Sequence, residues 1–348
     1  MDSDVYSKIN KDIKYYLITK EGISMKILVI FTGGTIGSKA KNGWISTDNS
    51  TSYSLINSYN NNKNIIFDSI SPYTVLSENL SSKELNILQK EISSHLNSGY
   101  NGIIVTHGTD TLQYSACAAE YAFSSCKIPI VFVSAAYPLD NEKTNGNINF
   151  EAAVEFICST NEGGVFVSYK NENEAFTSVH IPTKILQHQE TSSDIYSKNN
   201  SIYATYDGNI KLNSVTISQN KGVGVSEYKE NPGILVIESH PGDGYMYSLN
   251  NVKAVILKPY HSATLNTSSK SFQEFCLLAK NKNIPIFAVN INQGICYEST
   301  SLFNDLGIIS LPYCTFISAY MKLWLALSLK KDVVEFMKTN LTNEYLYI

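Results

Sequence analysis

The sequence of 348 residues contains no arginine, so the 27 residues of its Lys+Arg count are all lysines. Only arginine has the planar fork that grips a carboxylate or a phosphate at two points. An acidic ligand must therefore be held by hydroxyl groups, backbone N–H groups or lysine ammonium groups. The formal net charge of −4 gives none of the basic surface that binds nucleic acid, so we expect no nucleic-acid partner.

Other features are also missing. No apolar run reaches the roughly 18 residues that cross a bilayer, so we expect no membrane insertion. Met1–Ser24 has charged residues but no apolar stretch of the signal-peptide type, which favours the cytoplasm. The six cysteines form no CxxC pair and no zinc-ligand spacing, so neither a disulfide framework nor a metal site is expected. Because Met25 directly precedes the first clear strand, residues 1–24 are interpreted as an extension or a misassigned start.

The chain is long and apolar enough, at 43% hydrophobic residues, to form one large domain or two. Short apolar runs that end at Gly, Pro or polar residues predict buried strands. These runs are Lys26–Thr32, Gly102–Thr106, Ile130–Ser134, Gly164–Ser168, Ile234–Glu238, Ala254–Leu257 and Ile286–Asn290. Strands that are apolar along their whole length favour a mainly parallel sheet covered on both faces.

Helical spacing of apolar residues alternates with these runs. The predicted helices are Ser81–Ser98, Ala116–Phe123, Phe150–Cys158, Ser271–Lys280 and Thr315–Ser328. The polar stretch Tyr203–Asn231 has one short alternating piece at Val215–Ser218 and is typical of an interdomain linker. The pattern therefore predicts an α/β protein.

Two threonines directly follow two of the apolar strands: Thr35 in TGGTIG and Thr109 in HGTDT. Ligands bind at the carboxyl ends of strands in open parallel sheets, so the two hydroxyls share a crevice if their strands are near neighbours. Gly33, Gly34 and Gly108 would let backbone N–H groups approach a substrate or an oxyanion. The alternatives are a purely structural glycine turn and a helix N-cap at Thr109-Asp110. The glycine tract fits no phosphate-binding motif.

Together, TGGTIG (Thr32–Gly37) and HGTDT (His107–Thr111) closely resemble the bacterial L-asparaginase family, over about Lys26–Leu329. The missing export signal makes the chain more similar to the cytoplasmic type. The resemblance implies a larger flavodoxin-like N-terminal domain with the catalytic groups and a smaller C-terminal α/β domain. The expected limits are 1–24 for the extension, 25–205 for the catalytic domain, 206–231 for the linker and 232–348 for the C-terminal domain.

By motif position, the resemblance implies that Thr35 is the nucleophile. Thr109, Asp110 and Lys184 in IPTK would form the second catalytic group. Amide hydrolysis needs an activated hydroxyl, a base for its proton and donors for the oxyanion, and a lysine whose pKa is depressed by burial can be that base. The alternative for Lys184 is a solvated surface lysine.

The resemblance also implies a substrate clamp. Ser77 would bind the α-carboxylate, while Glu78 and Asp110 would hold the α-ammonium, and a Glu at this position goes with greater tolerance of glutamine. Asn266, in YHSATLNT, matches a residue that the family delivers across a dimer interface, so a homodimer or homotetramer is expected. No cofactor and no metal is implied. His107 and His261 are interpreted as hydrogen-bonded structural histidines.

Two segments depart from the family pattern. The mobile loop after TGGTI usually has a tyrosine, and here the best-aligned aromatic is Trp44, whose indole donates but cannot relay a proton. Tyr53 or Tyr59 could take that place, or Thr35 could be activated through Thr109 and Lys184. In Ser134–Phe150, Tyr137 stands at a usual arginine and Asn147 at a usual proline, which weakens inference about the substrate.

The expected function is hydrolysis of L-asparagine to L-aspartate and ammonia through a threonyl-acyl intermediate, with L-glutamine as a possible second substrate. One alternative is an amidohydrolase acting on a modified or peptidic asparagine or glutamine. Another is an ammonia-releasing subunit like the asparaginase-like subunit of archaeal tRNA-dependent amidotransferases, which YHSATLNT also resembles. A third is a catalytically silent homologue that binds an amino acid.

Overall fold

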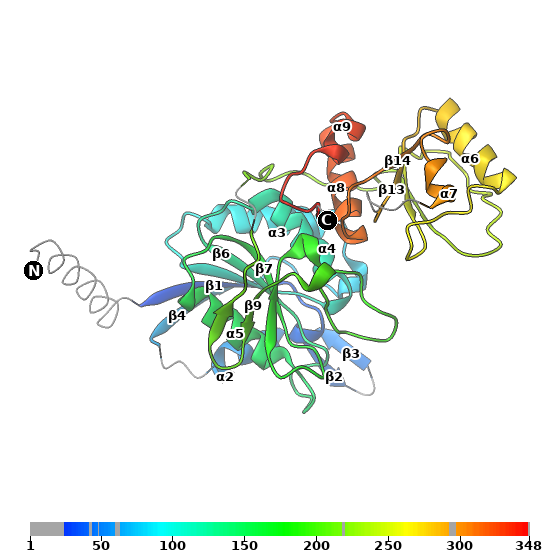
Figure 1. Ribbon diagram of the computed structural model, residues 1–348. Coiled ribbons are helices and arrows are strands. Elements are labelled where there is room, and N and C mark those ends of the chain that lie inside the picture. Colours follow the sequence, from blue (N-terminus) through cyan, green and yellow to red (C-terminus); the bar gives the residue numbers. More distant parts are fainter. Residues whose placement is uncertain are drawn as a thin grey trace, which may run out of the picture.

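Two separate β-sheets organise the computed structural model, with helices packed around each of them (Figure 1). The structure describes residues 24–41, 44–47, 49–59, 63–217, 220–291 and 297–346. One sheet has eight strands and the other has four, which agrees with the predicted two-domain α/β fold. No helix among the described residues is long and apolar enough to cross a membrane.

The larger sheet has the strand order β10-β9-β8-β7-β6-β5-β1-β4. The strands from β4 to β7 run parallel, and β8, β9 and β10 extend the sheet in antiparallel fashion. Their bounds are β1 Met25–Phe31, β4 Ile65–Ile70, β5 Gly102–Thr106, β6 Pro129–Val133, β7 Gly164–Tyr169, β8 Thr177–His180, β9 Ile202–Tyr206 and β10 Ile210–Leu212. A small hairpin pairs β2 (Ser38–Lys41) with β3 (Trp44–Thr47).

Helices cover both faces of this sheet, as the wholly apolar strands predict (Figure 1). The helices are α2 Asn49–Ser58, α3 Ser82–His95, α4 Leu112–Phe123 and α5 Gly146–Ser159. Alternate residues of β1 enter opposite cores: Ile27 and Val29 pack with α2 and α5, whereas Leu28 and Ile30 pack with α3 and α4. This alternation follows from the two-residue period of a strand.

The smaller sheet is wholly parallel, with the order β11-β12-β13-β14. Its strands are β11 Ile234–Glu238, β12 Ala254–Lys258, β13 Ile286–Ala288 and β14 Ile308–Ser310, and its helices are α6 Lys270–Asn281, α7 Glu298–Ser301, α8 Phe316–Leu329 and α9 Val333–Lys338. One side of α8 packs on the small sheet through Leu323. Another side packs on α4 through Ile317 and Met321, so α8 joins the two domains.

The stretch taken as a linker is more ordered than its composition indicates. Within it, Ile210–Leu212 forms β10, and the Tyr228 ring is buried against α4 and α8. The predicted alternating piece at Val215–Ser218 forms no strand over its described residues, 215–217. Residue 218 lies outside the described residues. Val215 and Ile217 instead pack on the core beneath α5, which accounts for their apolar character.

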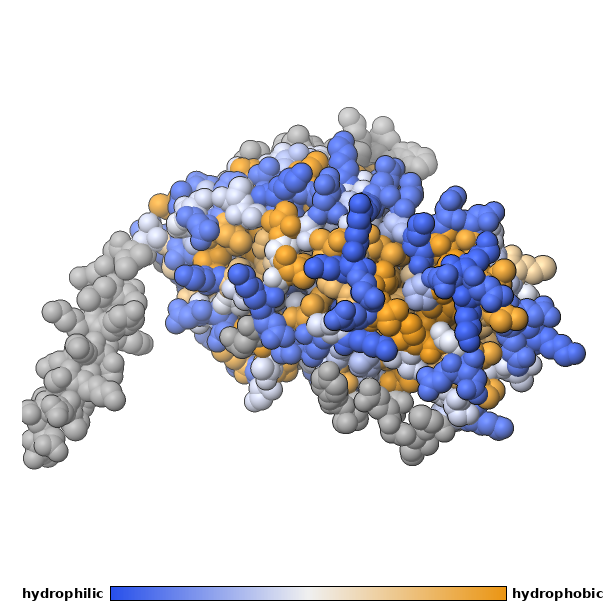
Figure 2. Space-filling model, turned by 90° about the horizontal axis from the view of Figure 1, so that it is seen from above, coloured by the Kyte–Doolittle hydropathy of each residue, from blue (hydrophilic) through white to orange (hydrophobic). Residues whose placement is uncertain are grey.

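The face seen from above carries apolar side chains between hydrophilic ones (Figure 2). A groove of about 370 Å³ is lined by residues of both domains: Leu80, Leu85, Thr111, Tyr114, Val236, Phe316, Tyr320 and Trp324. Three of these residues belong to α8, so the groove follows the boundary between the domains.

Candidate active site

The two threonine loops lie side by side at one edge of the large sheet. Strands β1 and β5 are parallel neighbours, with Phe31 opposite Thr106, so the segments that follow them leave the sheet together. Thr35 begins the short 3-10 helix η1 (Thr35–Gly37), and Thr109 begins η3 (Thr109–Thr111). The condition for a shared crevice, that the two strands be neighbours, is therefore met.

Glycines allow three segments to meet at this edge. Gly34 has φ +74°, and a Cβ added to it would lie 2.2 Å from the Gly108 Cα. A Cβ on Gly108 would lie 2.4 Å from the Ser77 Cβ. The loops after β1 and β5 and the 3-10 helix η2 (Ser77–Asn79) therefore touch at distances that only glycine permits. However, the Gly34 N–H donates to the Val75 carbonyl at 3.0 Å, so it is not a free oxyanion donor as the sequence suggested.

Ser77 and Asp110 are joined at the same place. The Ser77 hydroxyl donates to the Asp110 carboxylate at 3.1 Å, and the Thr111 hydroxyl donates to the Ser77 carbonyl at 2.9 Å. Ser77 is buried, whereas Glu78 and Asp110 are exposed. Three of the four residues assigned to substrate binding from the resemblance thus lie on two segments in direct contact. The carboxylates face solvent, where an ammonium group could reach them.

Hydrogen bonds to the segment after β6 hold the Thr109 side chain in place. Its hydroxyl donates to the Ala135 carbonyl at 2.8 Å and lies 2.7 Å from the Ser134 hydroxyl. A hydroxyl has one proton, so Thr109 accepts from Ser134 while it donates to Ala135. Thr109 is buried, and Thr35 is partly exposed. These bonds fix the Thr109 side chain without any contribution from a lysine.

His188 is a neighbour of Thr109 that the sequence did not reveal. Its Nε2 lies 3.0 Å from the Thr109 carbonyl oxygen, and its Nδ1 lies 3.1 Å from the Asp194 carbonyl oxygen. Carbonyl oxygens only accept, so a ring nitrogen that carries a proton donates to the carbonyl beside it. The His188 ring therefore links the Thr109 loop to the segment of Asp194. No local motif in QHQE indicates this role, because the partners are distant in the sequence.

The Lys184 side chain bonds to the C-terminal segment and not to Thr109 or Asp110. Lys184 ends the 3-10 helix η4 (Pro182–Lys184), and its ammonium donates to the Asn343 carbonyl of the C-terminal segment. Burial lowers the Lys184 pKa, although Glu120 and Glu344 oppose this change. A buried lysine with a depressed pKa was expected, but no hydrogen bond joins this ammonium to Thr109 or Asp110, all three of which the structure describes. The structure therefore does not bring together the second catalytic group as the resemblance implied.

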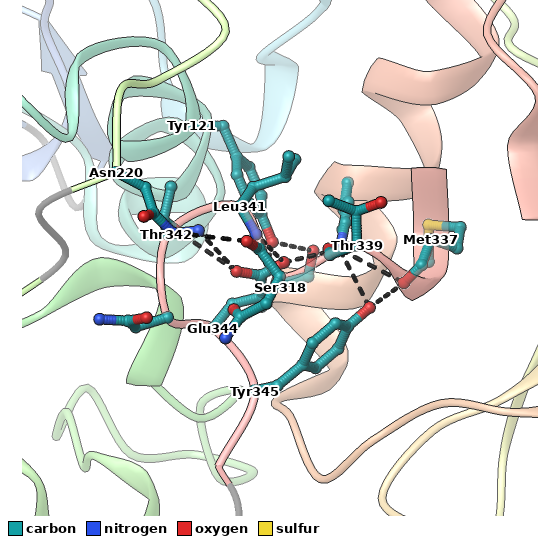
Figure 3. A network of polar contacts seen from close by, with 12 residues as sticks. Tyr121, Asn220, Ser318, Met337, Thr339, Leu341, Thr342, Glu344 and Tyr345 are labelled. Carbon is teal, nitrogen blue, oxygen red and sulfur yellow. Dashed lines mark hydrogen bonds and ion pairs between the residues drawn. The ribbon is translucent and has the colours of Figure 1, made fainter. Parts of the chain in front are cut away.

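A buried polar network explains where the C-terminal segment lies (Figure 3). The Lys322 ammonium, on α8, is fully buried and bonds to Glu344 Oε1 at 2.6 Å and to the Tyr345 hydroxyl at 3.0 Å. Glu344 also accepts from the Thr342 N–H at 2.7 Å. The ion pair thus fixes residues 341–346 against α8, and this position brings Asn343 to Lys184.

Three aromatic residues were considered as replacements for the tyrosine of the mobile loop after TGGTI. Trp44 lies in strand β3 and Tyr53 in α2, but their side chains lie outside the described residues. Tyr59 is described: its hydroxyl donates to Glu155 of α5 at 3.2 Å, and its ring packs edge-on against Phe67. Its side chain is thus fixed on the face of the sheet that α5 covers and is not placed at Thr35.

Asn266 belongs to the smaller domain. It lies exposed in the loop between β12 and α6, where its side-chain oxygen accepts from Ser268 at 3.1 Å. Within this single chain, no hydrogen bond joins it to the other candidate residues in the described ranges.

The histidines were interpreted as structural. His107 is buried and contacts the Gly108 carbonyl at 2.8 Å through Nδ1, as a hydrogen-bonded structural histidine would. His261 is exposed. The described residues contain no group of three or more His, Cys, Asp or Glu side chains that could hold a metal ion.

The structure is thus an α/β protein with two threonines at the ends of neighbouring parallel strands and a hydrogen-bonded Ser77–Asp110 pair beside them. Residues 26–219 match the family model described as "Asparaginase, N-terminal", and the chain belongs to this family. This confirms the asparaginase family expected from TGGTIG and HGTDT, whereas the bacterial cytoplasmic type stays a prediction.

Two relatives of the chain are both named as an amidotransferase subunit. The chain is 30% identical over 180 residues to a glutamyl-tRNA(Gln) amidotransferase subunit of Methanosarcina acetivorans, covering 51% of this chain and 42% of that protein. It is 22% identical to the protein of the same name from Sulfolobus acidocaldarius, covering 79% of this chain and 65% of that protein. The chain thus spans less than two thirds of the length of either relative.

Solved structures agree on the fold. L-asparaginase I from Vibrio cholerae superimposes with a TM-score of 0.78 at 20% identity, over 93% of this chain and 100% of that one. A probable cytoplasmic L-asparaginase from Campylobacter jejuni gives 0.72 at 19% identity, over 90% and 99%. At these identities the likeness concerns the two-domain fold.

Proposed function

We propose that this protein hydrolyses the side-chain amide of L-asparagine to L-aspartate and ammonia, with Thr35 as the nucleophile. The observation that carries the proposal is the contact of the Thr35, Thr109 and Ser77 segments through Gly34 and Gly108. This contact puts two hydroxyls and a carboxylate at one strand edge, the set of groups that acyl transfer requires.

In the proposed reaction, the Thr35 hydroxyl attacks the amide carbon, ammonia leaves, and water hydrolyses the threonyl ester. The Asp110 carboxylate, which already accepts from Ser77, is the proposed acceptor of the Thr35 proton. The bond to the Ala135 carbonyl holds the Thr109 side chain in place, and Thr109 would position the substrate carbonyl that Thr35 attacks. Lys184 is bound to Asn343 and has no part in this proton path. No step needs a cofactor or a metal.

The proposed substrate clamp comes from the resemblance and suits a chain without arginine. The Ser77 hydroxyl would turn from Asp110 to the α-carboxylate. Glu78 and one oxygen of Asp110 would hold the α-ammonium, which leaves the other Asp110 oxygen for the Thr35 proton. Asn266 is remote from the site within one chain, so its proposed role needs a second copy in a homodimer or homotetramer. The cytoplasm remains the proposed location, and the chain segments 25–205 and 232–348 the proposed domains.

A second candidate is an ammonia-releasing subunit of an amidotransferase. The relatives named as amidotransferase subunits favour it. In that role the protein would release ammonia and pass it to a protein partner. L-glutamine is then an equally suitable test substrate.

The experiment is ammonia release by the purified protein from L-asparagine, L-glutamine and D-asparagine. Fast turnover of free L-asparagine supports the first proposal. Slow turnover by the chain alone, together with co-purification of a stoichiometric partner that accelerates it, supports the amidotransferase role. Thermal stabilisation by aspartate without any ammonia release would contradict both and indicate a silent binding protein.

A further inference from the structure

A polar cavity of about 560 Å³ lies at the carboxyl ends of β6 and β7, next to the candidate active site. It is lined by three segments: residues 136–148 after β6, residues 170–172 after β7, and residues 191–194. This volume is within the range of small-molecule sites. The proposed function uses none of these residues.

The cavity is joined to the active site at two places. The Thr109 hydroxyl donates to the Ala135 carbonyl at 2.8 Å, and the next residue, Ala136, lines the cavity. His188 makes a second connection, because its ring contacts both the Thr109 carbonyl and the carbonyl of Asp194, another lining residue. The lining of the cavity is therefore joined to Thr109 through Ala135 and through His188.

Two unpaired cations line the cavity. The ammonium groups of Lys143 and Lys170 make no ion pair or hydrogen bond with any residue in the described ranges. The carboxylates of Asp194 and Glu172 also line the cavity but pair with neither lysine; Asp194 accepts from the Glu172 N–H at 3.0 Å and from the Tyr196 hydroxyl at 3.2 Å. The Glu172 residue itself is exposed to solvent. The lysines are thus free to bind an anionic group of a ligand, as single ammonium donors do.

The strand order sets the direction in which a substrate would lie. Ser77 lies directly against the loop after β5, which carries Thr109, and the cavity lies on the β6 side of that loop, because the parallel strands run β4-β1-β5-β6-β7. If Ser77 holds the α-carboxylate and the carbonyl reacts between the threonines, the amide nitrogen is directed toward β6. Whatever is attached to that nitrogen would enter the cavity.

We propose that the cavity is a subsite for the leaving amine, and that the protein also hydrolyses β-aspartyl amides whose amine carries a carboxylate. This inference rests on the proposed function. The Thr35 oxygen bonds to the β-carbonyl carbon, the C–N bond breaks, and the amine leaves with the proton that Thr35 gave up. Water then hydrolyses the ester and releases aspartate. Lys143 and Lys170 bind the carboxylate of the departing amine.

The test uses the full chain and three substrates: L-asparagine, β-aspartylglycine, and β-aspartylglycine capped as its N-methylamide. Aspartate release gives kcat/KM for each. The free carboxylate should raise kcat/KM over the capped form roughly tenfold, the effect of one charge-assisted hydrogen bond. The Lys170→Gln variant should lower this ratio several-fold, because only Lys143 remains, and Lys90→Gln, an exposed lysine of α3, should leave the ratio unchanged. Lys143→Gln serves if the first variant does not fold.

The outcomes separate the two proposals. Turnover of asparagine with no turnover of β-aspartylglycine, or with equal rates for the free and capped forms, overturns the subsite and leaves the proposed function standing. Turnover of β-aspartylglycine without asparagine supports the subsite and changes the preferred substrate. No aspartate from any of the three overturns both proposals.

Discussion

Replacing Gly34 by alanine tests how closely the catalytic loops are packed. Gly34 has φ +74°, a conformation that costs an L-residue about 1–2 kcal/mol. The new Cβ would also lie 2.2 Å from the Gly108 Cα. Carbon atoms pack at about 3.5–4.0 Å, so the two loops must separate by about 1 Å or more. Such overpacking costs a further 1–3 kcal/mol, roughly, and we expect a total loss of about 2–5 kcal/mol in the free energy of unfolding.

The same change should strongly reduce activity. Thr35 follows Gly34 directly, and a displacement of about 1 Å costs roughly 100-fold in rate. Gly99→Ala is the matched control, because Gly99 has φ +81° and nothing within 4 Å of its added Cβ. It lies at the opposite edge of the sheet, before β5, so it should lose only about 1–2 kcal/mol and retain full activity.

Urea unfolding and kcat for ammonia release would be measured for both variants. A Gly34→Ala variant that is as active as the unaltered protein and no less stable than Gly99→Ala would contradict the close packing of the two loops.

Three further changes test other parts of the structure. Glu344→Gln leaves the buried Lys322 ammonium unpaired and should lower the free energy of unfolding by about 3–5 kcal/mol in urea titrations; a loss under about 1 kcal/mol would contradict the C-terminal network. Thr109→Val keeps the shape but removes the hydroxyl, and should reduce kcat at least about 100-fold while circular dichroism stays unchanged; unaltered kcat would exclude Thr109 from catalysis. Burial lowers the pKa of both His107 and His180 to about 4 from the ordinary 6.5. Only the unfolded chain then takes up these protons as the pH falls from 6.5 to 4, so each histidine should cost about 3 kcal/mol of stability over that window; a flat stability profile would refute this.

Sequence patterns predicted the central strands and the shared crevice because both depend on local features. An apolar run such as Gly102–Thr106 is buried on both faces, and the polar residues after it must lie at the sheet edge. The antiparallel strands β8 and β9 were not predicted. Thr177–His180 has two hydroxyl side chains and no alternation, and it becomes a strand only through pairing with β7 and β9. Such long-range pairing is invisible in a short window of sequence.

In the candidate site, too, local motifs predicted some positions and missed others. Motifs that follow strands or loops correctly predicted which residues lie together: Thr35, Thr109, Ser77 and Asp110. Lys184 could not be placed by its motif, because its partner Asn343 is 159 residues away. The position of that partner depends on the buried ion pair of Lys322 with Glu344, which no local pattern signals. His188 was missed for the same reason, since it acts through backbone carbonyls that any residue has.

The proposed hydrolysis depends most directly on the hydroxyl of Thr35. Ammonia release from L-asparagine should be compared between the unaltered protein, Thr35→Ser, which keeps a hydroxyl, and Thr35→Ala, which does not. We expect the alanine variant to lose at least about 10⁴-fold in kcat, as enzymes do without their nucleophile, and the serine variant to retain measurable turnover. An alanine variant within tenfold of the unaltered protein, correctly folded, would contradict the assignment of Thr35 as the nucleophile.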